Sequence, residues 1–179
     1  MPASGKAPIL IVTGPPGVGK TTTTAALAAR STRAVHLESD AFFRFIRSGY
    51  VEPWNPESHD QNRIVMGIVA RAAAGYAAAG YGTIVDGIVI PGWFLEPLRD
   101  AFHDAGHRVA CAVLRAPLST CMARARDRKR EPLADPSVIE RLWRSFADLG
   151  ELERNASTWT TRAPTRWRTW LRSASRTDC

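Results

Sequence analysis

The residues at positions 14–21 read Gly-Pro-Pro-Gly-Val-Gly-Lys-Thr and match the pattern G-x-x-x-x-G-K-S/T at every fixed position. Glycines allow the backbone to adopt positive φ and to approach a phosphate closely, so the loop amides form an anion nest at the start of a helix. Lys20 adds a mobile positive charge, and the Thr21 hydroxyl is an oxygen ligand of the kind that Mg²⁺ prefers. This stretch therefore predicts a site for the phosphates of ATP, and GTP is not excluded.

The segments that flank this loop fit the context that the pattern requires. Residues 8–12 form a short apolar, β-branched run that predicts a buried strand, and the Ala-rich residues 22–30 favour a helix. A Gly-rich turn that matches by chance is the alternative, and the complete pattern with both flanks disfavours it. The residues of this region that are expected to bind the nucleotide are Gly14, Pro15, Pro16, Gly17, Val18, Gly19, Lys20, Thr21 and Thr22.

The rest of the chain alternates short apolar runs with helical patterns. Strands are expected at residues 34–38, 83–86 and 107–114, and helices over 41–47, 58–80, 94–105, 119–128 and 136–155. A Ser-x-x-Gln capping box opens the long helix, and Asp135 caps the last one. Alternating strands and helices predict an α/β fold with a parallel sheet covered on both faces. Ligands of such sheets bind beyond the carboxyl ends of the strands, where Asp40, Asp86 and Arg115 lie.

The composition, with 45% hydrophobic and 23% charged residues, predicts a single globular domain over residues 1–179. There is neither a membrane-length apolar run nor a signal-peptide core, and the three cysteines have no metal-ligand spacing, so we expect a cytoplasmic protein with reduced thiols. The net charge of +7 is compatible with nucleic-acid binding, but no aromatic-basic stripe accompanies it, and an Arg-rich C-terminal segment is the preferred explanation. The four histidines lack metal-pair spacing and are assigned no role. A monomer or a homodimer is expected.

Further features at the strand ends carry a family resemblance. They are Asp40, the segment Val85-Asp86-Gly87, and Leu114-Arg115-Ala116-Pro117 followed by Arg124 and Arg128. With the glycine loop, they make residues 8–155 resemble the small P-loop kinases of the nucleoside-monophosphate-kinase-like group. Within that group the chain is most similar to the branch of chloramphenicol phosphotransferase, zeta-toxin-type kinases, the tunicamycin-resistance ATP-binding protein, and gluconate and shikimate kinases. The resemblance implies a three-layer P-loop fold with a five-stranded parallel sheet in the order 2-3-1-4-5, and an Arg-rich lid at about residues 127–136.

The resemblance also implies roles for the charged residues. The acid that matches Asp40 in related kinases binds the acceptor hydroxyl and acts as its base, which suits phosphoryl transfer because that reaction depends mainly on alignment; an N-cap before a helix at Ala41 is the alternative. Asp86 is expected to hold Mg²⁺ with Thr21 or to contact an attacking group, and an Asp-Gly turn is the alternative. Arg124 and Arg128, one helical turn apart, are expected to bind ATP and to stabilise transition-state charge. For the whole basic segment, which includes Arg126, Lys129 and Arg130, a solvated face is the alternative.

The acceptor pocket is expected where aromatic rings meet a few polar groups, which suits a mid-sized organic molecule. Trp54 lies between two prolines, Trp93 follows a Pro-Gly pair, and Arg44 is a candidate partner for an anionic acceptor. Coverage of the core by several of these rings is the alternative. The residues expected to bind the acceptor are Asp40, Phe43, Arg44, Trp54, Arg63, Asp86 and Trp93, and Phe42, Asn62 and Phe94 are further candidates.

From residue 156 to residue 179 the chain is rich in Arg, Thr and Trp and departs from the family pattern. The candidate for a fifth strand is residues 158–161, and residues 167–174 keep the spacing of an amphipathic helix. The predicted function is ATP- and Mg²⁺-dependent transfer of the γ-phosphate to a hydroxyl of a small molecule, such as an antibiotic, a sugar or a nucleoside-like acceptor. A nucleoside monophosphate kinase and a non-catalytic ATP-binding resistance or regulatory protein are the alternatives.

Overall fold

Five consecutive buried residues, Ile9–Thr13, form strand β1 in the middle of a parallel sheet. The computed structural model describes residues 7–127 and 135–158 of the chain. The other strands are β2 (Ala34–Glu38), β3 (Gly82–Asp86), β4 (Val109–Arg115) and β5 (Ala156–Thr158). Their order is β2-β3-β1-β4-β5 and every pairing is parallel, which confirms the predicted topology.

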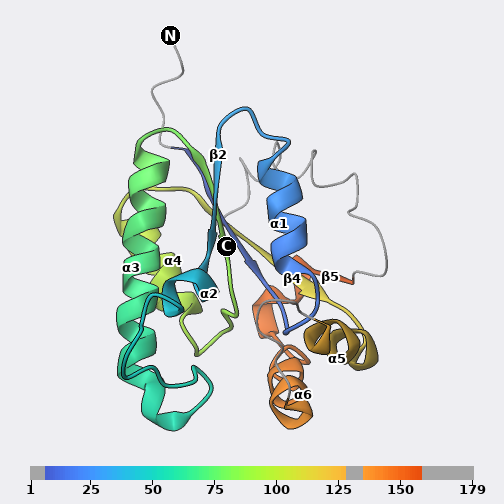
Figure 1. Cartoon of the computed structure of the whole chain (residues 1–179). Helices are drawn as coiled ribbons and strands as arrows, with labels where there is room; N and C mark the ends of the chain where they lie inside the picture. Colours follow the sequence, from blue (N-terminus) through green and yellow to red (C-terminus); the bar gives the residue numbers. More distant parts are fainter. Residues whose placement is uncertain (1–6, 128–134, 159–179) are drawn as a thin grey trace.

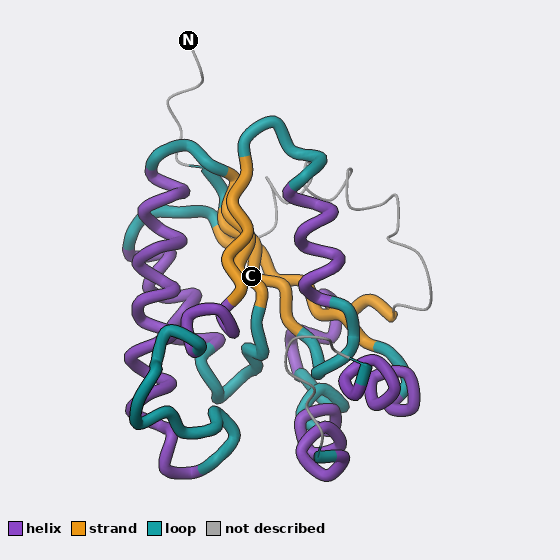
Figure 2. The backbone as a smooth tube through the Cα atoms, in the orientation of Figure 1, coloured by secondary structure: helices purple, strands orange, loops and turns teal. Residues whose placement is uncertain are grey.

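Helices cover both faces of this sheet and make three layers (Figure 1). They are α1 (Lys20–Ala28), α2 (Ser39–Phe43), α3 (His59–Ala78), α4 (Leu95–Asp104), α5 (Leu118–Arg126) and α6 (Pro136–Arg144), with 3-10 turns at Pro56–Ser58 and Gly150–Asn155. Figure 2 shows α3 and α4 on one side of the strands and α1 on the other. Side chains of β1 alternate accordingly: Ile9 and Ile11 pack into the core with α3 and α4, and Leu10 and Val12 pack into the core with α1 and α5.

Two helices differ from their predicted bounds in ways that matter for the site. The helix expected at 41–47 is α2, Ser39–Phe43, with Glu38 at its N-cap position. Asp40 therefore lies inside the first turn, and the expectation that it caps a helix beginning at Ala41 is wrong. The helix expected to reach residue 155 ends at Arg144, and the 3-10 turn Gly150–Asn155 follows a loop.

The predicted capping box of α3 is wrong, because its two side chains bind a loop instead of the helix. The Ser58 hydroxyl donates to the Pro53 carbonyl at 2.9 Å or to the Asn55 carbonyl at 2.7 Å. The Gln61 amide donates to the Val51 carbonyl at 2.6 Å and accepts from the Val51 N–H at 2.9 Å. Both residues thus hold the loop that precedes α3 against the start of that helix.

At the C-terminal end, β5 begins and ends earlier than the predicted 158–161, and it pairs with β4 through Val113, Leu114 and Arg115. The helix expected over residues 167–174 and most of the predicted lid, residues 128–134, lie outside the described residues. Asp135 caps α6 as predicted, since its carboxylate accepts from the Ser137 N–H at 2.8 Å. None of the helices within residues 7–127 and 135–158 is long and apolar enough to cross a membrane.

Candidate functional site

The glycine loop joins β1 to α1 and lies directly against α5. Gly17 has a φ of 74°, and a Cβ there would lie only 2.1 Å from the Cys121 carbonyl oxygen. Gly14 is comparably enclosed, since a Cβ would lie 2.4 Å from the Leu114 carbonyl oxygen. These two positions require glycine because packing leaves no room for a side chain, and Gly17 also because of its left-handed backbone.

Lys20 begins α1, and its ammonium folds back over the loop. Its Nζ donates to the Gly14 carbonyl at 2.8 Å and to the Pro15 carbonyl at 3.1 Å. The helix N-terminus follows Gly19 without a side-chain cap, and Thr21 and Thr22 are exposed there. Unsatisfied backbone N–H groups and a lysine at the same helix end make a site that suits phosphate.

Arg124 brings a second positive charge to the loop from α5. Its Nη1 lies 3.5 Å from the Val18 carbonyl oxygen, which is a long hydrogen bond. Burial raises the pKa of the Cys121 thiol, and the nearby positive charges of Lys20 and Arg124 lower it, so both cations act on the same small region. Arg126 is exposed on the same helix, and Arg128 lies outside the described residues together with Lys129 and Arg130.

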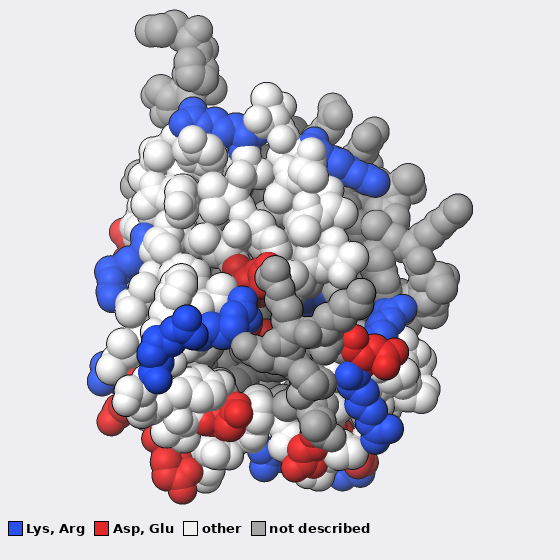
Figure 3. Space-filling view, viewed as in Figure 1, with Lys and Arg blue, Asp and Glu red and all other residues white. Residues whose placement is uncertain are grey.

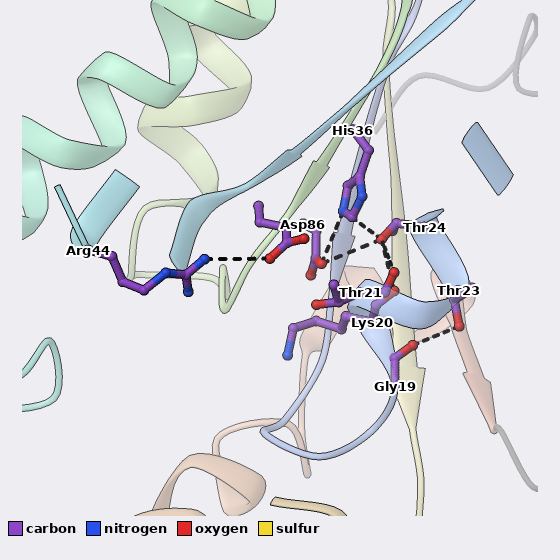
Figure 4. A network of polar contacts seen from close by, with 9 residues as sticks. Gly19, Lys20, Thr21, Thr23, Thr24, His36, Arg44 and Asp86 are labelled. Atoms are coloured by element: carbon purple, nitrogen blue, oxygen red, sulfur yellow. Dashed lines mark hydrogen bonds and ion pairs between the residues drawn. The ribbon is translucent and has the colours of Figure 1, made fainter. Parts of the chain in front are cut away.

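Asp86 ends β3 beside the glycine loop and is nearly fully buried, with 3% of its side chain exposed. Its Oδ2 lies 3.3 Å from His36 Nε2 and 3.4 Å from Thr24 Oγ1. His36 Nε2 and Thr24 Oγ1 are 2.8 Å apart, so the three side chains form a closed triangle (Figure 4). Both contacts to the carboxylate are long for hydrogen bonds.

His36, for which the sequence predicts no role, is part of this triangle. A histidine on a short strand offers no local signal, because its neighbour depends on which strand pairs with β2. The register pairs Glu38 with Asp86 and His36 with Ile84, two residues earlier on β3. Thr24 reaches the same point because it lies one helical turn after Lys20 on α1.

The oxygen donors near the phosphate loop fit the cation predicted for this site. Thr21 provides a hydroxyl at the start of α1, and Asp86, at the end of β3, provides a buried carboxylate next to Thr24 of the same helix. Hydroxyl and carboxylate oxygens are ligands that Mg²⁺ accepts while it retains several waters. A cluster of three or more His, Cys, Asp or Glu side chains, as a metal site built by the protein alone would need, is absent from the described part of the chain.

The ends of β2 and β3 lie against each other, and Asp40 is next to this contact. A Cβ on Gly87 would lie 2.4 Å from the Ser39 hydroxyl oxygen, so the segments that follow β2 and β3 are in close contact here. Asp40 follows Ser39 and is exposed, and no hydrogen bond or ion pair engages its carboxylate among residues 7–127 and 135–158. An unpaired carboxylate on a helix of the scaffold can accept a hydrogen bond from a ligand.

A cavity of about 770 Å³ connects Asp40 with the glycine loop. Lys20 and Pro16 form part of its wall, and so do four predicted acceptor residues, namely Phe43, Arg44, Trp54 and Trp93, together with Phe94. The cavity also includes Arg47, together with Tyr50, Glu52 and Asp135, which were not predicted from the sequence to contact the acceptor. Its volume is in the range of pockets that bind small organic ligands.

Asp86, which was also predicted to contact the acceptor, does not line this cavity, and three further candidates lie elsewhere. Arg63 is exposed, lies 3.7 Å from Asp60, and does not line the cavity. Asn62 is buried and donates to the Pro53 carbonyl at 2.8 Å, which gives it a structural role in holding the loop before α3. Phe42 contacts a separate shallow groove beside α3.

Arg115, at the end of β4, makes a bidentate ion pair instead of facing the cavity. Its two terminal nitrogens lie 2.8 and 2.6 Å from the carboxylate oxygens of Glu153. Hydrogen bonds from the Arg115 guanidinium, and then from the Leu149 N–H, hold the pKa of Glu153 below its ordinary value. This pair connects β4 to the 3-10 turn Gly150–Asn155.

Solved structures of a resistance protein and of small-molecule kinases share this fold. The tunicamycin resistance protein of Deinococcus radiodurans is 20% identical, with a TM-score of 0.66 over 95% of this chain and 96% of that chain. A gluconokinase from Sinorhizobium meliloti 1021 is 17% identical, with a TM-score of 0.66 over 96% and 93% of the two chains. The shikimate kinase of Acinetobacter baumannii, solved with shikimate, is 19% identical, with a TM-score of 0.61 over 93% and 92%. At these identities the likeness shows the fold, and no curated protein sequence matches the chain significantly.

The glycine loop, the strand order and these neighbours agree with one another. They confirm the resemblance to P-loop small-molecule kinases that the sequence predicts. Residues 9–149 match the family model AAA_33, described as an AAA domain, and the chain therefore belongs to this family of P-loop proteins with a kinase-like fold.

Proposed function

We propose that the chain is an ATP- and Mg²⁺-dependent phosphotransferase that transfers the γ-phosphate of ATP to a hydroxyl of a small molecule. The observation that carries the proposal is that Lys20 and Pro16 of the glycine loop line the same cavity as Asp40, whose carboxylate no described residue engages. Phosphoryl transfer needs a donor and an acceptor held in line, and little covalent chemistry from the protein. A cavity lined by both a candidate phosphate site and a carboxylate supports that arrangement.

Each part of the site then has a physical task. Loop amides and Lys20 bind the phosphates of ATP, and Arg124 offsets charge that develops on the transferred group. Thr21 and Asp86 would hold Mg²⁺, which supplies further charge neutralisation at the phosphates when it is bound. Asp40 accepts a hydrogen bond from the acceptor hydroxyl, orients its oxygen toward the γ-phosphate, and takes up its proton as the new O–P bond forms and ADP leaves.

The test is the substitution Asp40→Asn with a matched acid outside the cavity as control. Asp40→Asn preserves size and removes the acceptor of the hydroxyl proton, so we expect transfer of labelled γ-phosphate to fall by about 10²- to 10⁴-fold. Binding of Mg-ATP, measured by calorimetry, is expected to stay unchanged. Asp60→Asn removes an exposed carboxylate of α3 that does not line the cavity, and it is expected to leave both measurements unchanged. Turnover retained in Asp40→Asn would refute the role given to Asp40.

A further inference from the structure

The wall of the acceptor cavity is mainly apolar. Eleven of its eighteen residues are apolar or aromatic, and five of these are the aromatic residues Phe43, Tyr50, Trp54, Trp93 and Phe94. Aromatic faces bind flat π-systems by stacking or edge contacts and offer little to a polyol, whose hydroxyls need hydrogen-bond partners. The wall therefore favours an acceptor with a flat body.

Two of these rings are held in place by a strained turn. Ile90 and Trp93 exchange two backbone hydrogen bonds of 3.2 and 2.9 Å around Pro91-Gly92. The next residue, Phe94, has a φ of 65° and is the non-glycine residue with positive φ in the described part of the chain. A bulky residue in this region of φ is strained, and such strain is concentrated at binding and catalytic sites. The turn fixes the Trp93 and Phe94 rings with their centroids 5.5 Å apart.

The charged residues of the wall are mostly engaged by the protein itself. Arg44 lies 3.9 Å from Glu38, Glu52 accepts from the Tyr50 hydroxyl at 3.2 Å, and Asp135 caps α6. Lys20 binds loop carbonyls of the phosphate site. On the face shown in Figure 3, blue and red side chains are likewise interspersed instead of gathered by sign.

Two charged residues of the wall remain for a ligand. Asp40 and Arg47 have no hydrogen bond or ion pair from their side chains to any other described residue. Asp40 is the partner proposed for the hydroxyl, which leaves Arg47 as the guanidinium of the wall that no described residue engages. A phosphate dianion or a carboxylate inside the cavity would need several charge-assisted hydrogen bonds to offset its lost hydration.

From these contacts we infer that the acceptor is an uncharged molecule with a flat aromatic or heteroaromatic body that carries the reacting hydroxyl. This inference rests on the proposed function, since it names the class of molecule that occupies the same cavity. It also argues against a nucleoside monophosphate as acceptor, because that molecule would bring a dianion to a wall in which Arg47 is the one guanidinium, among the described residues, that the protein leaves unengaged.

Binding and transfer can be measured separately on compounds that differ in one property. Uridine and uridine monophosphate share a ring and differ in charge, and 2-phenylethanol, glucose and gluconate add a simple ring alcohol, a neutral polyol and an anionic polyol. Affinities are measured by calorimetry on the full chain without nucleotide. We expect uridine and 2-phenylethanol to bind at least about ten-fold more tightly than glucose, gluconate and uridine monophosphate, a difference set by ring contacts and charge.

Substitutions of Trp93 test whether contact with its ring causes the preference for ring compounds. Trp93→Leu is expected to weaken binding of the two ring compounds by about three- to ten-fold and to leave the affinity for glucose unchanged. Trp93→Phe keeps an aromatic face and is expected to restore most of the loss, which guards against a mere folding defect in the Leu variant. Tyr76→Leu, an exposed aromatic of α3 outside the cavity, is the matched control.

The outcomes separate the inference from the proposed function. Tighter binding of gluconate or uridine monophosphate than of uridine, or no binding by any ring compound, would overturn the inference. Transfer of labelled phosphate to gluconate would also overturn the inference about the acceptor, but it would support the proposed phosphotransferase activity. Selective binding of the ring compounds without transfer of phosphate to any of them would support the inference about the cavity and count against the proposed activity.

Discussion

Substitution of Gly17 by Ala tests how the glycine loop and α5 are packed. The added Cβ would lie 2.1 Å from the Cys121 carbonyl oxygen and 3.1 Å from the Ala125 nitrogen. These two atoms belong to residues four apart in α5, so the methyl would push against a hydrogen-bonded pair of that helix. Because both neighbours are backbone atoms, relief requires α5 to move away from the loop.

The contacts around Gly17 determine how much stability the Gly17→Ala substitution is expected to lose. Forcing a methyl into a packed region costs about 1–3 kcal/mol, and an L-residue at a φ of 74° costs about 1–2 kcal/mol more. The free energy of unfolding should therefore fall by about 2–5 kcal/mol. Gly19→Ala is the matched control, since Gly19 also has positive φ, 101°, but the nearest atom to its Cβ is Arg124 Nη1 at 3.9 Å. There the backbone cost of about 1–2 kcal/mol is expected alone.

Urea unfolding of both variants measures the difference between their free energies of unfolding. Calorimetric titration with Mg-ATP measures the effect of each substitution on nucleotide binding. Because α5 carries Arg124 over the loop, the shift in Gly17→Ala should also weaken nucleotide binding. Equal stability of the two variants would refute the claim that α5 packs against Gly17 as described.

Three further predictions concern charges at and near the site. Lys20→Ala should weaken Mg-ATP binding at least about ten-fold in calorimetry, because the loop loses its ammonium; unchanged affinity would contradict the phosphate site. His36→Phe should lower kcat several-fold and raise the Mg²⁺ concentration needed for half-maximal rate, because Asp86 loses its neighbour, whereas His36→Gln should recover part of the loss; equal kinetics in both variants would argue against a positioning role. The lowered pKa of Glu153 means that its pair with Arg115 stabilises the fold above pH 4.5, the ordinary pKa of a glutamate, and that this contribution is lost as pH falls through the lower, folded-state pKa. Glu153→Gln should remove this contribution of the pair to the fall of Tm at acidic pH. An unchanged pH profile of Tm in the variant would exclude a stabilising role of the pair.

The glycine loop was predictable because its function depends on contiguous residues. Strand, loop and helix follow one another along the chain, and the backbone of residues 14–21 has the positive φ values that the glycines suggested. The positions of Asp40 and Asp86 at one edge of the sheet were predictable for a related reason. Parallel strands bring their carboxyl ends to one edge of the sheet, so a polar residue that follows an apolar strand is predicted to lie at that edge.

Arg63 and Asn62 show where reasoning along the sequence failed. Both lie near the start of α3, one residue apart, and the sequence analysis considered both for the acceptor pocket. The rotation of the helix turns Asn62 inward to the loop at Pro53 and leaves Arg63 in solvent beside Asp60. A change of about 100° per residue separates a buried side chain from an exposed one, and the helix orientation is set by packing with the sheet.

The sequence by itself determined the nucleotide loop, the alternation of strands and helices and the acids at the strand ends, because these depend on local backbone preference and on the period of apolar residues. Only the tertiary structure decided that His36 meets Asp86, and that α6 brings Asp135 into a cavity with Asp40 and Trp93. Those contacts join residues about 40 to 95 positions apart in the printed sequence. They depend on strand register and on the distance between packed helices, which many weak contacts set together and which no short stretch of chain specifies.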